Sequence, residues 1–122
     1  MDATVIAISI VAVFFAGMGG YALVAPSRLI APFDIALNSV TARSEVRAVY
    51  GGFGLAIASV LGAAAVTPGL RAGVVVTVAA AWGGMAFGRL TSLLDGPSSF
   101  YPNWFYFVVE AAAAATLFAV AG

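Results

Sequence analysis

Four long runs of apolar residues, separated by short breaks, constrain this chain more than any other feature of its sequence. A helix of roughly 20 apolar residues crosses the hydrocarbon core of a bilayer, which is about 30 Å thick. Inside lipid the backbone must satisfy its own hydrogen bonds, and a helix does this within a single segment. The runs therefore predict four transmembrane helices, at about residues 3–25, 44–66, 71–94 and 103–121.

The breaks between the runs fall at residues that end helices. Pro26 lacks a backbone N–H and disfavours helix in the residue before it, so we expect the first helix to end there. The stretches 67–69 (Thr-Pro-Gly) and 95–99 (Asp-Gly-Pro-Ser-Ser) predict tight turns, and the mixed segment 27–43 is expected at the membrane interface. Short connections make successive helices antiparallel neighbours. The predicted fold is all-α, a four-helix antiparallel bundle that forms a single integral membrane domain over residues 1–122.

The composition supports a membrane protein and excludes several kinds of chemistry. The chain is 63% hydrophobic and 8% charged, whereas soluble domains are about half apolar and about a quarter charged. It has no lysine, histidine or cysteine, so Schiff-base and thiol chemistry, iron–sulfur clusters and histidine-ligated haem or metals have no supporting residues. The net charge is zero, which gives no support to nucleic-acid binding. We expect no cofactor, no metal and no catalytic residue.

The arginines predict which side of the membrane each connection faces, because Lys and Arg accumulate in cytoplasmic loops. Arg28, Arg43, Arg47 and Arg89 belong to the connections after the first and third runs, whereas Arg71 alone marks the opposite side. We therefore expect both termini outside, in the periplasm of a bacterial inner-membrane protein. The first run lacks a preceding basic residue and exceeds the apolar region of a signal peptide, so we expect it to be retained.

Charged residues inside membrane helices are costly, and each of them needs a partner. Arg89 lies about five residues before the end of the third predicted helix, roughly 7 Å deep, and Glu110 lies roughly 9 Å into the fourth. Because these helices are antiparallel neighbours, we expect the two side chains to meet. Asn103 and Tyr106 share the helix face of Glu110. The sequence thus predicts a charge cluster at the cytoplasmic end of the bundle, made of Glu45, Arg47, Tyr50, Arg89, Asp95, Tyr106 and Glu110.

Several roles are open for this cluster. In the first, its arginine–carboxylate pairs only fix the register of the helices. In the second, they line a pocket for an anionic or amphipathic ligand, such as a lipid headgroup or a quinone. A proton path through Glu110 is a third alternative, although a single carboxylate makes no relay.

Small residues recur at helical spacing and predict where helices approach closely, since association in lipid depends on close backbone packing. The second span places Gly51, Gly54 and Ala58 on one face. We interpret such faces as tight packing inside the bundle; alternatively, one of them faces a partner protein. The third span has a similar stripe with a Gly-xxx-Gly step, made of Thr77, Ala81, Gly84 and Gly88.

The aromatic residues divide into interfacial and packing positions. Residues 104–106 lie where an interfacial aromatic belt is expected. Trp82 lies in the middle of the third span, so we expect it in the core or against lipid instead. Phe14 and Phe15 are expected to face lipid.

Three segments together resemble a known family: 44–52 (SEVRAVYGG), 87–92 (FGRLTS) and 95–96 (DG). The family is a bacterial group of small four-helix membrane proteins described only as a domain of unknown function. The resemblance spans nearly the whole chain and implies an integral membrane bundle without an established activity. The topology is also similar to that of DoxX-like membrane proteins, some of which are linked to quinone-dependent oxidation. The residues that match the family pattern are Glu45, Arg47, Tyr50, Gly51, Gly52, Gly88, Arg89, Asp95 and Gly96.

Two functional hypotheses follow from the sequence. The first is an accessory subunit without intrinsic redox cofactor, which packs against a larger membrane complex or forms a homo-oligomer in the lipid bilayer. The second is a lipid- or quinone-binding module that uses Arg47, Arg89 and Glu110. An enzyme or a transporter is disfavoured, because the chain lacks the usual nucleophile–base pairs and shows no inverted repeat.

Overall fold

The computed structural model describes residues 2–121; Met1 and Gly122, the two ends of the predicted domain 1–122, lie outside the described residues. Every secondary-structure element in the described range is helical, which confirms the all-α fold. The four predicted spans are confirmed, and the chain is an integral membrane protein by the length and composition of its helices. The spans are Ala3–Val24, Val40–Val66, Pro68–Leu94 and Phe100–Ala121.

Most spans are built from more than one helical element. The element η2 is a π-helical turn, η1 and η3 are 3-10 helices, and η4 is a short segment kinked at Tyr101. In chain order the elements are α1 (Ala3–Val24), α2 (Pro26–Ile30), η1 (Ala31–Phe33), α3 (Val40–Val46), η2 (Arg47–Gly52), α4 (Phe53–Val66), α5 (Pro68–Thr91), η3 (Ser92–Leu94), η4 (Phe100–Trp104) and α6 (Phe105–Ala121).

Three spans begin earlier in the sequence than the apolar pattern predicts. Ser39 caps α3, because its Oγ accepts a hydrogen bond from the backbone N–H of Ala42 at 3.0 Å. Pro68 begins α5, since proline has no N–H to leave unsatisfied in the first helical turn. The fourth span starts at Phe100 with η4, whose backbone is kinked at the non-helical residue Tyr101. A side-chain cap at Ser39 and a proline at Pro68 set the first two of these boundaries, and hydropathy registers neither.

The predicted interfacial segment 27–43 is more ordered than expected. It contains most of α2, all of η1 and the start of α3, and only 34–39 is non-helical. Pro26 and Ile30 are buried, so α2 is anchored against the bundle. η1 contacts η4, which joins this segment to the start of the fourth span.

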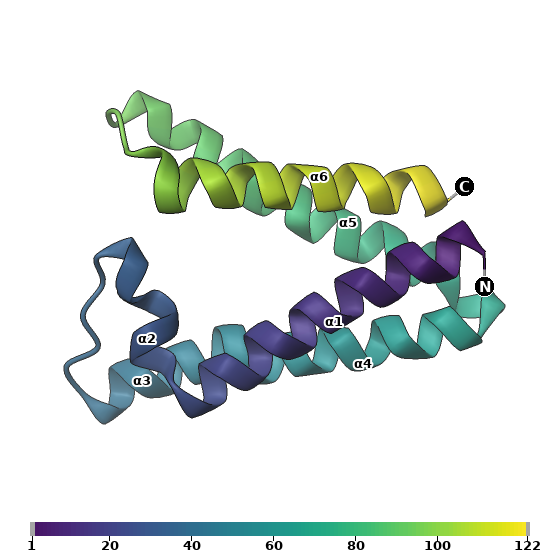
Figure 1. Ribbon diagram of the computed structural model, residues 1–122, viewed down its shortest axis with the longest axis horizontal. Helices are drawn as coiled ribbons and strands as arrows, with labels where there is room; N and C mark the ends of the chain where they lie inside the picture. The colour runs from purple at the N-terminus through teal and green to yellow at the C-terminus, as the bar shows by residue number, and fades with distance from the viewer. Residues whose placement is uncertain (1, 122) are drawn as a thin grey trace.

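The spans form two antiparallel pairs (Figure 1). α1 packs along α4, and α5 packs along α6. The pairs meet near the chain termini and diverge toward the end that carries α2 and α3. The apolar core lies where they meet, and Ile8, Leu61, Val75 and Leu117 are fully buried there. The candidate site lies between the diverging ends.

Glycines allow α1 and the second span to touch. A Cβ atom at Gly19 would lie 2.8 Å from the carbonyl oxygen of Gly51, and one at Gly54 would lie 3.2 Å from the Cα of Gly19. Both distances confirm the predicted packing role of Gly51 and Gly54. Backbones this close gain the dispersion contacts that hold helices together in lipid.

The corresponding stripe on α5 does not pack inside the bundle. Its four residues, Thr77, Ala81, Gly84 and Gly88, are all exposed, and a Cβ atom at either glycine would meet nothing within 4 Å. The prediction of an internal contact here is therefore wrong for the described bundle. The buried face of α5 is formed instead by Val75, Val78, Ala79, Trp82 and Ala86.

Candidate functional site

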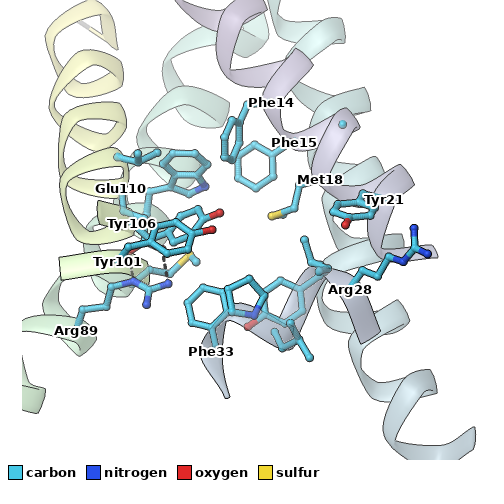
Figure 2. A pocket seen from close by; sticks show the side chains of 18 of the residues that line it. Phe14, Phe15, Met18, Tyr21, Arg28, Phe33, Arg89, Tyr101, Tyr106 and Glu110 are labelled. Carbon is cyan, nitrogen blue, oxygen red and sulfur yellow. Dashed lines mark hydrogen bonds and ion pairs between the residues drawn. The ribbon is translucent and has the colours of Figure 1, made fainter. Parts of the chain in front are cut away.

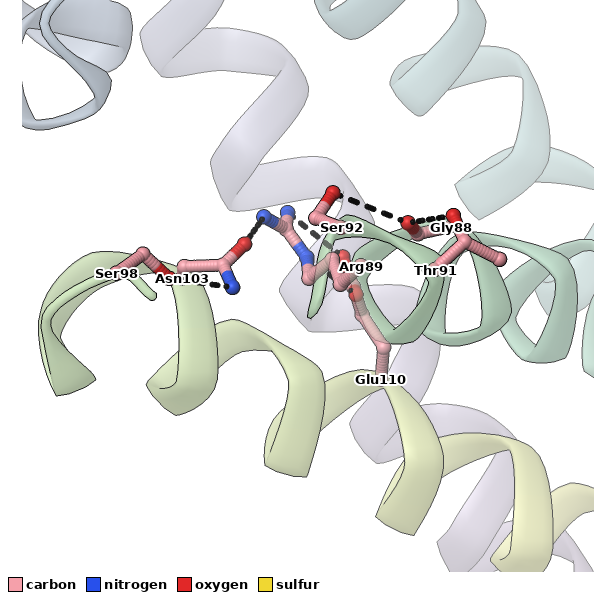
Figure 3. A network of polar contacts seen from close by, with 7 residues as sticks. All are labelled: Gly88, Arg89, Thr91, Ser92, Ser98, Asn103 and Glu110. Carbon is pink, nitrogen blue, oxygen red and sulfur yellow. Dashed lines mark hydrogen bonds and ion pairs between the residues drawn. The ribbon is translucent and has the colours of Figure 1, made fainter. Parts of the chain in front are cut away.

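Arg89 and Glu110 form a bidentate ion pair between α5 and α6 (Figure 3). Nε of Arg89 donates to Oε1 of Glu110 at 2.7 Å, and Nη2 donates to Oε2 at 3.1 Å. The Glu110 side chain is 6% exposed and that of Arg89 is 21% exposed. Within residues 2–121 this is the one ion pair, and it confirms the predicted meeting of the two side chains. Two parallel charge-assisted hydrogen bonds offset part of the cost of removing both groups from water.

Polar contacts continue from the ion pair to the adjoining loop (Figure 3). Nη1 of Arg89 donates to Oδ1 of Asn103 at 3.3 Å, and Nδ2 of Asn103 donates to Oγ of Ser98 at 3.2 Å. Asn103 thereby links the start of the fourth span to the guanidinium group that Glu110 binds. These contacts hold the loop end of the α5–α6 hairpin together.

Two aromatic rings cover the guanidinium group of Arg89. Its Cζ atom lies 5.5 Å from the centroid of the Phe33 ring and 5.8 Å from that of the Tyr106 ring. Phe33 belongs to η1, so the segment between the first two spans reaches across to α5 and α6. Cation–π contacts of this kind stabilise an arginine that is partly removed from water.

A cavity of about 520 Å³ opens beside the ion pair (Figure 2). Its lining residues come from both helix pairs and from α2 and η1, so it lies between the diverging ends of the bundle. Much of the wall is apolar and includes Phe14, Met18 and Val109, whereas Arg89 and Glu110 supply charged groups. An apolar wall with a few converging polar groups is typical of small-molecule sites. The other polar lining residues are Tyr21, Arg28, Tyr50, Tyr101 and Tyr106.

The comparison with known families covers nearly the whole chain. The family model described as Domain of unknown function (DUF4345) matches residues 3–121. The chain belongs to the DUF4345 family. No curated protein and no solved structure matches it. The matched range contains the four spans and every residue that lines the cavity of this DUF4345 protein.

The cavity brings together four of the residues in the predicted cluster. Tyr50, Arg89, Tyr106 and Glu110 all line it. Tyr50 lies on the π-helical turn η2, so the second span contributes to the site through its irregular segment. π-Helical turns inside α-helices are frequent at functional sites.

The structure places the other three predicted residues outside this cavity. Glu45 is exposed on α3. Asp95 is also exposed, and it lines a second pocket of about 500 Å³ with Asp34 and Ser98. Both carboxylates are exposed on the surface of the bundle, so neither is buried against an arginine inside it. Glu45, Asp95 and Arg47 therefore do not belong to the cluster that the structure forms around Arg89 and Glu110.

Arg47 and Arg71 bind the ends of helices rather than carboxylates. Nε of Arg47 donates to the carbonyl oxygen of Leu23, in the last turn of α1, at 3.0 Å. Arg71 donates to the carbonyl oxygens of Ala64 and Ala65, near the end of α4, at 3.0 and 2.7 Å. The last carbonyl groups of a helix have no partner within the helix, and arginine N–H groups satisfy them. This is the physical reason that Arg47 does not join the ion pair.

Six aromatic residues of the cavity lining are absent from the predicted cluster: Phe14, Phe15, Tyr21, Phe33, Trp82 and Tyr101. Phe33 lies in the segment assigned to the interface, and Trp82 was expected to pack without a role in a site. Phe15 was expected to face lipid, but it is 4% exposed and its ring centroid lies 4.9 Å from that of Trp82. The signal for Phe15 was Gly19, four residues later on the same helix face, because this glycine marks the packed side of α1.

Proposed function

We propose that this chain is a membrane-embedded module that binds a small amphipathic molecule, a lipid or a quinone, in the cavity beside Arg89 and Glu110. The observation that carries the proposal is the cavity itself. Its volume of about 520 Å³ falls within the range of about 300–1,000 Å³ found for ligand sites. A pair that served only to fix helix register would not require this space, because protein interiors are otherwise close-packed.

The two parts of the cavity suit the two parts of such a molecule. A guanidinium group has five N–H donors, and three of those of Arg89 go to Glu110 and Asn103. The others can donate to a polar head, as can the hydroxyl groups of the lining tyrosines. The apolar wall near Phe14 and Met18 suits a hydrocarbon tail, whose transfer from water is favourable.

Native mass spectrometry of the protein in lipid nanodiscs tests this function. We expect the wild-type protein to carry a bound small molecule and the Gly17→Phe variant to lose it. Gly17 lines the cavity and a Cβ atom there meets nothing within 4 Å, so the added ring can occupy the space without a backbone collision.

Gly20→Phe is the matched control for this experiment. Gly20 lies on the same helix, has the same open surroundings and is not part of the cavity lining. We expect this variant to retain the molecule. A wild-type protein without any bound small molecule, or equal retention by both variants, would contradict the proposed function.

A second candidate function is an accessory subunit that packs against a larger membrane complex or a second copy of the chain. The exposed stripe on α5, which contains Gly84 and Gly88, favours it, because a Gly-xxx-Gly step permits close contact between helices of different chains. The same spectra separate the two candidates. A protein partner adds the mass of a polypeptide and survives Gly17→Phe, whereas a ligand adds a small mass that this variant loses.

We also propose that both termini face the periplasm of a bacterial inner membrane. The start of α1 and the end of α6 lie at the same end of the bundle (Figure 1). Arg28, Arg43 and Arg47 belong to α2, α3 and η2 at the other end, and Arg89 lies in the last turn of α5. Basic connections remain cytoplasmic. Alkaline phosphatase fused to either terminus is expected to be active and green fluorescent protein dark. The reverse pattern would contradict this orientation.

A further inference from the structure

Trp82, a residue of the cavity lining, carries a polar atom that has no partner among the described residues. Trp82 lines the cavity and is 5% exposed. Its indole Nε1 is buried and has no hydrogen-bond acceptor among residues 2–121. An indole nitrogen can only donate, and buried N–H groups are nearly always hydrogen-bonded because an unsatisfied one is costly. A ligand that brings an acceptor oxygen to Trp82 would satisfy this donor.

The charges at the cavity favour a neutral ligand over an anion. Glu110 neutralises Arg89 through two hydrogen bonds, so a phosphate or carboxylate placed beside Arg89 would also meet the Glu110 carboxylate. Like charges repel strongly where little water screens them. Arg28, the other cation of the lining, is exposed and lies across the cavity, with its guanidinium group turned away from the ion pair (Figure 2).

Aromatic rings frame the space around Trp82. The ring centroids of Phe14 and Phe15 lie 5.6 and 4.9 Å from that of Trp82. Phe33 and Tyr106, which also line the cavity, have ring centroids 5.5 Å apart. Figure 2 shows Phe14 and Phe15 on one side of the space and Phe33 on the opposite side. Aromatic side chains favour stacked and edge-on contacts with a flat conjugated ring.

We propose that the ligand of this cavity is a flat, neutral ring that carries carbonyl oxygens and an apolar tail, which is the chemistry of a quinone. The Nε1–H of Trp82 donates to one carbonyl oxygen, and the ring packs among the aromatic side chains. This assignment rests on the proposed ligand-binding function and narrows its ligand class. A phospholipid fits less well, because its phosphate is an anion and because it has no flat conjugated ring to pack among the aromatic side chains.

Trp82→Phe tests the assignment, because it removes the N–H and keeps an aromatic ring. The probes are a decyl-substituted benzoquinone and decylbenzene, which share a six-membered ring and a tail but differ in the carbonyl oxygens. For the full-length protein in nanodiscs, we expect the variant to bind the quinone about fivefold more weakly, the effect of one neutral hydrogen bond. Its binding of decylbenzene is expected to be unchanged.

Trp104→Phe provides a matched control and a second readout. Trp104 is the other tryptophan of the chain and is not part of the cavity lining, so this variant should bind both probes as the wild type does. Trp82 is then the sole indole. We expect the quinone probe to quench its fluorescence saturably and decylbenzene to leave it unchanged, a measurement that does not depend on the folding of Trp82→Phe.

The outcomes separate this inference from the proposed function. Equal weakening of both probes by Trp82→Phe would mean that the indole contributes packing without donating a hydrogen bond. No weakening of either would mean that it contributes nothing, and each result would overturn the inference. Absence of saturable quenching in Trp104→Phe would overturn it as well. A wild-type protein that retains a small molecule but does not bind the quinone probe would overturn the quinone assignment and leave the proposed function standing. A wild-type protein that carries no bound small molecule and does not bind the quinone probe would overturn both.

Discussion

Replacing Arg89 with alanine is expected to lower the free energy of unfolding by about 3–5 kcal/mol, because it leaves a buried carboxylate without its counter-charge. The Glu110 side chain is 6% exposed and accepts two hydrogen bonds from Arg89. Alanine also removes the donor to Asn103 and the cation beside the Phe33 ring. Reversible unfolding in mixed micelles, followed by circular dichroism, measures the difference.

Two further variants show whether the lost stability comes from the Glu110 carboxylate that Arg89→Ala leaves unpaired. Arg71→Ala removes an arginine that binds only backbone carbonyl groups, so we expect a smaller loss of about 1–2 kcal/mol. Arg89→Met combined with Glu110→Leu removes both charges and should recover most of the stability, since apolar side chains of similar size can replace a buried ion pair. Equal losses in the two single arginine variants, or no recovery in the double variant, would contradict this account.

Gly19→Ala is expected to lower the free energy of unfolding by about 1–3 kcal/mol, the usual cost of overpacking a tight contact. The new Cβ atom would lie 2.8 Å from the carbonyl oxygen of Gly51 and 2.9 Å from the backbone nitrogen of Leu55. Both are backbone atoms, so α1 and the second span must separate to admit the methyl group. The same micelle unfolding experiment measures this effect.

Gly20→Ala is the control for this contact. A Cβ atom at Gly20 meets nothing within 4 Å, and alanine is the better helix former, so we expect stability equal to or slightly above that of the wild type. If the two alanine variants have the same stability, the close approach of Gly19 to Gly51 does not hold in the membrane.

The number of spans and the ion pair follow from local properties of the chain. Apolar runs and the breaks at Pro26, 67–69 and 95–99 are sufficient to define four helices. The regular rise of a helix converts sequence distance into depth, so a short connection brings Arg89 and Glu110 to the same level. Neither inference requires knowledge of which helix faces contact one another.

The cavity and the partners of the other arginines depend on packing between distant segments. Arg47, on η2, donates to the carbonyl oxygen of Leu23 near the end of α1. This contact is set by how the first two spans lie together. Nε1 of Trp82 has no acceptor among the described residues. It is a candidate donor to a ligand only because this indole lines the space where the two helix pairs diverge. No residue pattern along one helix carries this information.

Hydropathy does not identify the inward faces of these helices, because hydrocarbon tails accommodate apolar side chains as readily as the interior of the bundle does. Phe15 is therefore buried and its neighbour Phe14 is 42% exposed, although the two residues are chemically identical. Gly51 is buried against α1, whereas Gly84, which lies in a similar stripe of small residues on α5, is exposed. In lipid the close fit of one helix against another selects the buried face, and that fit exists only once the helices are assembled.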